Sequence, residues 1–225
     1  LISHDDFYFC PGWDTEFVNE INIMKHNNFY LSGTMVGATN KIPYYDNALP
    51  SEFNAGNNIE NFNESRLINN LDKIKTFDFQ GTTKCPGLIH KNIWIKVGGW
   101  SEEFSPTGGD DSDFAMKLWQ HDIRIFKGLG KSLVYHFGSV TTRKKKNNLF
   151  TYLGNKGNKI FLKKWKITIN FFENFYLKSG LDKNKNIIFN KYDGELIVPQ
   201  KKIRYFYELL KCKIQWLYLI LINYK

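Results

Sequence analysis

Hydrophobic positions recur along the chain with spacings that distinguish helices from strands. Apolar residues three and four positions apart predict helices over 14–27, 59–75, 90–97 and 113–121. Short apolar or alternating runs predict strands over 29–36, 123–126 and 132–137, and residues 86–89 form a further short apolar stretch. Segment 40–58, rich in Pro, Asn, Asp and Gly, predicts a surface loop. Strands interleaved with helices predict an α/β fold with a sheet flanked by helices.

The first six residues, LISHDD, have the pattern of a buried strand that runs into an acidic loop. A buried strand needs neighbouring strands with which to pair. We therefore expect the sequence to be a fragment that lacks an N-terminal portion, which would supply the rest of the sheet.

The C-terminal part has a different character, with few acidic residues and many lysines. A terminal helix is predicted over 202–224, and its longest apolar run, 216–222, falls short of the ~18 residues expected of a membrane span. Aromatic and basic residues along this helix predict an amphipathic segment, so we expect residues 203–225 to contact a membrane surface peripherally. Packing on its own domain or on a partner is the alternative. The predicted division is a domain over 1–170 and a basic linker with the helix over 171–225.

Charge is distributed unevenly along the 225 residues. The net charge of +9 combines −7 over residues 1–112 with +16 over residues 113–225. The acidic half indicates a cation site, and the basic half indicates phosphates of a small ligand, a nucleic acid or an anionic membrane. The sequence has no RRM, KH or helix-turn-helix signature, so no nucleic-acid partner is expected. Three scattered cysteines without a CxxC pair favour a reducing, cytoplasmic compartment.

Three clusters carry residue types that could do chemistry. In the first, Asp5 and Asp6 follow the opening strand, where ligands bind in open α/β sheets. Adjacent carboxylates repel each other, and Mg²⁺ or Mn²⁺ together with substrate phosphates relieves that repulsion. The alternative is a solvated acidic turn before a helix, with Asp14 as its N-cap.

The second cluster joins the loop GGWSEEF (98–104) to GGDDSDF (108–114). Glycines let a loop wrap closely around a ligand, and carboxylates at a helix N-terminus are stabilised by the helix dipole. A carboxylate held there could act as a general base toward an acceptor hydroxyl. The alternative is ordinary capping by Asp111 or Ser112.

The third cluster is YHFGSVTT (135–142), followed by the basic run 143–146. His136, at a predicted strand end, could ligate a metal, with Arg143 and Lys144 facing a phosphate. The alternative is a structural histidine beside a solvated charge run.

Taken in order, these motifs resemble the second half of a GT-A glycosyltransferase of the family-2 type. Asp6 matches the most constant position of the metal-binding DxD motif, and His4 stands where that family more often has Asp or Asn. Asp110 and Asp111 match the "ED" pair, with Asp111 as the better-aligned catalytic base. His136 matches a histidine that completes the metal shell in many members, and FLKKW (161–165) resembles the F-x-x-K-W element that follows the catalytic domain.

The resemblance implies a mixed GT-A sheet flanked by helices, with residues 1–170 as the C-terminal part of the catalytic domain. It implies inverting transfer from a nucleotide-diphosphate sugar to a glycan or lipid-linked acceptor, as in envelope polysaccharide synthesis, with Mn²⁺ or Mg²⁺ as cofactor. Asp5, Asp6, Arg143 and Lys144 would face the donor diphosphate, and the acceptor residues would be Gly99, Trp100, Glu103 and Asp113. The enzyme would act in the cytoplasm, at the inner face of the membrane.

Two other readings of the same residues are a metal-dependent phosphoryl-transfer enzyme and a non-catalytic basic module that binds membrane or nucleic acid. The first would use the same carboxylates on a phosphodiester. It leaves the GGWSEEF loop and the FLKKW element without a role.

Overall fold

The computed structural model describes residues 1–37, 53–105, 108–137, 147–181, 187–188, 190–200 and 202–222. Most of the predicted 40–58 loop lies outside these residues, as do Arg143 and Lys144.

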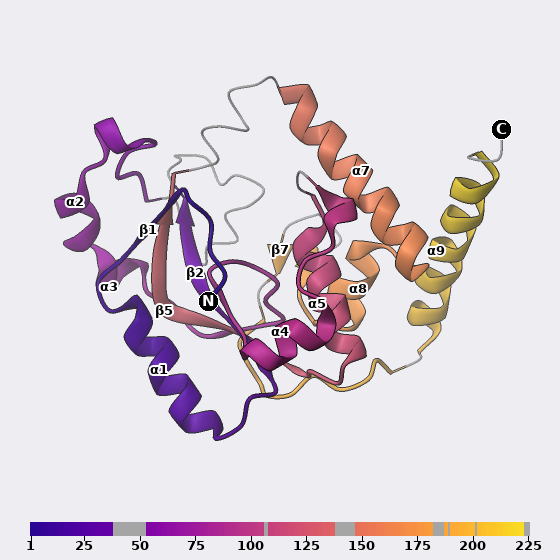
Figure 1. Ribbon diagram of the computed structural model, residues 1–225, viewed down its shortest axis with the longest axis horizontal. Helices are drawn as coiled ribbons and strands as arrows, with labels where there is room; N and C mark the ends of the chain where they lie inside the picture. Colours follow the sequence, from indigo (N-terminus) through magenta and orange to yellow (C-terminus); the bar gives the residue numbers. More distant parts are fainter. Residues whose placement is uncertain are drawn as a thin grey trace.

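A mixed five-stranded sheet, curled into a half-barrel, organises the fold (Figure 1). Its longest strand, β5 (Ile125–His136), runs parallel to β2 (Phe29–Gly37). The other edge of β5 pairs antiparallel with β3 (Phe79–Gln80) along its first half and with β1 (Phe7–Phe9) along its second half. The short strand β4 (Gly87–Leu88) pairs antiparallel with β2. The sheet therefore brings the N-terminal loop to the carboxyl end of β5.

Strand β5 corrects the prediction of two separate strands over 123–126 and 132–137. The intervening glycines are part of one strand, which shifts register against β2 between Ser32 and Thr34. A Cβ on Gly128 would lie 2.0 Å from the Phe79 ring, and one on Gly130 would lie 2.3 Å from the Thr76 carbonyl oxygen. These glycines allow close approach of a neighbouring segment rather than ending the strand.

The predicted helices agree with the structure in location more than in extent, and the two helices between residues 147 and 175 were not predicted. The predicted helix over 59–75 is three short pieces: η1 (Ile59–Asn61), α2 (Glu64–Ile68) and α3 (Leu71–Ile74). Asn58 and Asn63 each accept a hydrogen bond from a backbone N–H in the following turn, and so start new helices. Helix α1 (Trp13–Met24) has Gly12 at its N-cap, so Asp14 lies in the first turn and is not the cap.

The remaining helices lie on the other side of the sheet and beyond it (Figure 1). They are α4 (Lys91–Val97), η2 (Glu102–Phe104), α5 (Asp110–Gln120), α7 (Asn147–Trp165), α8 (Ile169–Phe175) and α9 (Ile203–Ile222). Strands β6 (Gly180–Leu181) and β7 (Ile187–Ile188) form a separate two-stranded ladder.

The main hydrophobic core extends from the sheet to the C-terminal helices. Tyr30 and Phe126 of the sheet, Phe114 of α5, and Phe161 of α7 are buried in one cluster with Phe172 of α8. The predicted boundary at residue 170 falls within α8, and the core includes residues on both sides of it. Cys10, Cys85 and Cys212 are buried free thiols.

Among the described helices, none has the length and apolar character needed to cross a bilayer.

Candidate functional site

Asp6 and His136 meet at the carboxyl end of the paired strands β2 and β5. Antiparallel pairing sets Phe7 of β1 opposite His136, the last residue of β5. The Asp6 carboxylate oxygen Oδ2 lies 3.0 Å from His136 Nε2, and the Phe137 N–H donates to the Asp6 carbonyl oxygen at 3.2 Å. Both side chains are mostly buried, with exposed fractions of 22% and 12%. The fold therefore joins two residues that are 130 positions apart in the sequence.

His4 lies beside this pair. Its ring stacks on Phe7 with centroids 5.1 Å apart and meets the His136 ring edge-on at 6.5 Å. Desolvation lowers the pKa of His4 and the charge of Asp6 opposes that change, while His136 lowers the pKa further. The charge of Asp110 also acts on the His4 pKa, so the start of α5 lies within electrostatic reach of the N-terminal loop.

The residues of this pair fit a divalent ion that takes its other ligands from a substrate. No group of three or more His, Cys, Asp or Glu side chains suited to a metal occurs among the described residues. Mg²⁺ and Mn²⁺ are commonly held by one or two carboxylates, with the remaining sites filled by water and substrate phosphates. Asp6 Oδ2 and His136 Nε2 offer one oxygen and one nitrogen at one point. Asp5 is exposed in the same loop.

Helix α5 begins one turn earlier than predicted and places two carboxylates at its N-terminus. Gly109 is the N-cap, with φ 88°, a left-handed conformation that favours glycine. The Gly108 N–H donates to Asp110 Oδ1 at 2.9 Å. The alternative of capping by Asp111 or Ser112 is therefore wrong, since both lie in the first turn of the helix, where its dipole favours negative charge.

Asp111 is a partly buried carboxyl group with an unusual acidity. Burial raises its pKa to about 7, and the neighbouring charges of Asp110 and Glu173 add to this effect while Lys84 opposes it. Within the described part of the chain, its carboxylate makes no hydrogen bond or ion pair. A carboxyl group with a pKa near neutrality can accept and release a proton under ordinary conditions.

Two residues near Asp111 have no counterpart in the sequence-based prediction. Ser112 Oγ donates to Glu173 Oε1 of α8 at 3.3 Å, and burial raises the pKa of Glu173. Lys84 lowers the pKa of both Asp111 and Glu173 through its charge, and its carbonyl oxygen accepts from the buried Tyr30 hydroxyl at 3.2 Å. The one sequence feature that distinguishes Glu173 is that no other acidic residue lies between Asp122 and Asp182, and this feature does not indicate its position beside Asp111.

The opposite side of α5 carries a second, fully paired carboxylate, that of Asp113. Asp113 is completely buried, and it accepts from Trp165 Nε1 at 2.7 Å and from Ser101 Oγ at 2.7 Å. Lys164 Nζ lies 3.0 Å from Asp113 Oδ1 and 2.7 Å from Glu103 Oε1. This network of Ser101, Glu103, Asp113, Lys164 and Trp165 fastens the 98–104 loop and α7 to α5.

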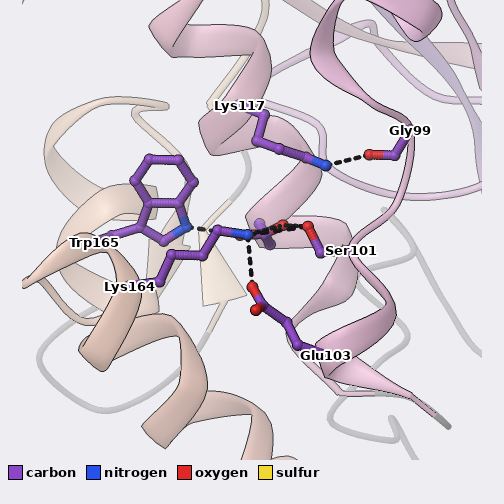
Figure 2. A network of polar contacts seen from close by, with 7 residues as sticks. Gly99, Ser101, Glu103, Lys117, Lys164 and Trp165 are labelled. Carbon is purple, nitrogen blue, oxygen red and sulfur yellow. Dashed lines mark hydrogen bonds and ion pairs between the residues drawn. The ribbon is translucent and has the colours of Figure 1, made fainter.

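The network includes two of the residues predicted to bind an acceptor, and a third lies beside it. Asp113 and Glu103 bind Lys164, and the Gly99 carbonyl oxygen accepts a hydrogen bond from Lys117 (Figure 2). Trp100 is partly buried, with its ring 6.3 Å from that of Trp94. Acceptor binding by these four residues stays a prediction, while the contacts of Asp113 give it a structural role.

Helix α7 also packs directly on the glycine loop that starts α5. A Cβ on Gly157 would lie 1.6 Å from the Gly108 carbonyl oxygen, so the helix backbone touches the loop backbone. Lys156 Nζ donates to the Ser105 carbonyl oxygen at 3.0 Å on the adjacent turn. The segment after the strand β5 thus helps to position Asp110 and Asp111.

No protein-family model matches the chain, and a search of curated proteins finds no detectable relative.

Proposed function

We propose that this chain is the acceptor-side part of a GT-A-type glycosyltransferase that inverts configuration at the transferred sugar. The observation that carries the proposal is the 3.0 Å contact between Asp6 and His136 at a sheet end within electrostatic reach of the α5 N-terminus. These residues come from three separate motifs. A shared ligand site gives one reason for all of them to be brought together.

The proposed division of labour follows from the two kinds of carboxyl group. Asp6 and His136 would hold the divalent ion, which when bound would neutralise charge on the departing diphosphate. Asp111, with a pKa of about 7, takes the proton from the acceptor hydroxyl. The hydroxyl oxygen then bonds to the anomeric carbon as the bond from that carbon to the diphosphate oxygen breaks. The bonding electrons leave with the nucleoside diphosphate, and attack from the opposite face inverts the carbon.

Other residues would maintain this arrangement. Burial, with the charges of Asp110 and Glu173, keeps the pKa of Asp111 high enough for it to hold the proton that it receives. The network around Asp113 fixes the loop that carries Trp100, whose ring offers flat apolar surface to a sugar. The acceptor proposed is a glycan or lipid-linked hydroxyl.

Mn²⁺ binding tests the proposal most directly. The chain would be titrated with Mn²⁺ by electron paramagnetic resonance, alone and with UDP or GDP, and the diphosphate should tighten Mn²⁺ binding. Asp6→Asn should abolish the gain, whereas Asp14→Asn, which removes an exposed carboxylate in the same segment, should retain it. Equal Mn²⁺ affinity in wild type and Asp6→Asn would overturn the metal site.

Turnover is the second part of the test. A panel of nucleotide sugars would be screened with the chain together with any segment that precedes it in the natural protein. At least one donor should show Mn²⁺-dependent release of the nucleoside diphosphate, by hydrolysis or transfer. Cleavage of a phosphodiester by the same residues, with no sugar released from any donor, would favour phosphoryl transfer instead.

A further inference from the structure

Helix α9 exposes a continuous apolar stripe on the outside of the molecule. The stripe residues follow one another at alternating intervals of four and three: Ile203, Tyr207, Leu210, Ile214, Leu217 and Leu221. Every one of them is more than half exposed, from 52% for Leu217 to 90% for Ile203. Isolated exposed apolar residues are ordinary, but a stripe of six along one 20-residue helix indicates a contact surface.

The opposite face of α9 is fixed to the protein, so the stripe cannot turn inward. Tyr205 and Cys212 are buried, with exposed fractions of 8% and 4%. The Tyr205 ring lies 5.1 Å from that of Phe171 in α8, and Cys212 Sγ lies 3.7 Å from Thr168 Oγ1. Figure 1 shows α9 at the far end of the molecule from α1, next to α7.

Positive charge borders the stripe on both sides. Arg204 and Lys211 flank one edge, and Lys213 flanks the other, by their positions around the helix. The one acidic residue of α9, Glu208, lies farther round and pairs with Lys211 at 3.0 Å. Lys166, which directly follows α7, lies 5.1 Å over the Trp216 ring, away from the stripe.

We infer that the outer face of α9 lies flat in the headgroup region of an anionic lipid bilayer. Helices that bind in this plane combine an apolar face with Lys or Arg beside it, and aromatic residues are favoured at the same depth. Tyr207 and Tyr218, together with the exposed Phe206, supply those aromatic residues. This inference is independent of the proposed transfer reaction.

The charges argue against a second copy of the chain as the occupant. In a helix pair packed along this stripe, the flanking positions would face their equivalents across the seam. All charged residues at those positions in α9 are basic, so either orientation would set positive charge against positive charge. An anionic bilayer attracts the same basic residues, and each one near the surface raises the affinity for the membrane about fivefold.

Vesicle binding by the full chain tests the inference. Flotation with vesicles of phosphatidylcholine and phosphatidylglycerol should recover the protein, and pure phosphatidylcholine vesicles should recover much less. The double substitution Ile214→Ser with Leu217→Ser should lower the partition coefficient at least about tenfold, because two apolar side chains are removed from the surface. The double substitution Lys211→Gln with Lys213→Gln should weaken binding to the anionic vesicles and leave binding to pure phosphatidylcholine vesicles unchanged.

The matched control is Ile23→Ser with Ile95→Ser, which removes two apolar side chains that are 70% and 63% exposed on α1 and α4. It should bind vesicles as the wild type does. Slow reaction of Cys212 with a thiol reagent in every variant would show that α9 remains docked, since that thiol is buried.

Three results would overturn the inference. They are failure to bind anionic vesicles, equal binding by the Ile214→Ser with Leu217→Ser variant, and a concentration-dependent dimer that this variant abolishes. The last would assign the stripe to a second copy of the chain.

Discussion

Asp111 and Asp113 lie two residues apart on α5, yet their surroundings differ in kind. Asp113 is buried with Lys164, Trp165 and Ser101 around its carboxylate. Asp111 lies among Asp110, Glu173 and Lys84, where burial raises its pKa to about 7. Each helical residue turns the side chain by about 100°, so two residues place carboxylates on nearly opposite sides.

The difference shows that one turn of helix can hold both a carboxylate that stabilises the fold and a carboxyl group that exchanges a proton near neutral pH. A carboxylate whose charge is matched by a cation and hydrogen bonds is held in its ionised form and stabilises the fold through them. A carboxyl group near other acids is biased toward its protonated form and can exchange a proton near neutral pH. Four experiments test this contrast.

The largest effect is expected for Asp111→Asn on turnover. If Asp111 is the proposed base, the rate of sugar transfer or donor hydrolysis should fall by about 10²–10⁴-fold, because an amide cannot accept the proton. Mn²⁺-dependent binding of the diphosphate should remain. Steady-state kinetics with the Asp14→Asn variant as control would measure this, and near-normal turnover would remove Asp111 from the mechanism.

Asp113→Asn should instead act on stability. It leaves Lys164 without its buried counter-charge, so the free energy of unfolding should fall by about 3 kcal/mol. Urea denaturation followed by circular dichroism would measure the change. Asp111→Asn provides the comparison and should not lower stability at pH 7. Equal losses in the two variants would contradict the assigned difference.

The substitution Lys164→Met tests the same network by removing its positive charge. The variant leaves the buried Asp113 with only its neutral donors, and we expect a loss of about 2 kcal/mol. Lys163→Met, at the exposed neighbouring position, should stay within about 0.5 kcal/mol of the wild type. The two urea midpoints should therefore separate. If they coincide, Lys164 does not stabilise the loop.

The smallest effect is a pH dependence of stability due to Asp111. Its pKa is about 7 in the folded protein and has an ordinary value of 3.8, so the folded state binds more protons between these values. The stability gained by protonation is complete below pH 3.8 and is lost as pH rises toward 7. Relative to Asp111→Asn, the wild type should lose on the order of 1 kcal/mol between pH 4 and 7. Parallel stability profiles would argue against the raised pKa.

Local signals predicted an α/β fold and the positions of several helices and strands, but not β1, α7 or α8. Phe29–Gly37 and Lys91–Val97 differ from their predicted ranges by one residue, because apolar periodicity and flanking glycines specify such elements locally. The predicted break between two strands failed at Gly128 and Gly130, where glycine accommodates Phe79 and Thr76 from another part of the chain. A glycine in the sequence is equally consistent with a loop and with a strand position where another segment packs closely, so the sequence could not distinguish the two.

The candidate site shows the same limit. Asp6, His136 and Asp111 could be named from residue types and motif order, but Glu173 and Lys84 could not be assigned to Asp111. Burial and the surrounding charges determine the pKa of Asp111, and both the burial and the charges of Lys84 and Glu173 depend on segments distant in the sequence. Asp113 was predicted to bind an acceptor, whereas the structure reveals its partners Lys164 and Trp165.

The sequence alone determined the approximate positions of several helices and strands, where acidic and basic residues concentrate, and that α9 is amphipathic. Those properties depend on neighbours along the chain and on side-chain chemistry. Tertiary structure decided that Asp6 touches His136, that Asp113 is paired with Lys164 while Asp111 has no such partner among the described residues, and that the apolar stripe of α9 faces outward. Burial and charge pairing depend on which segments pack together, and sheet pairing and core packing join residues more than 100 positions apart.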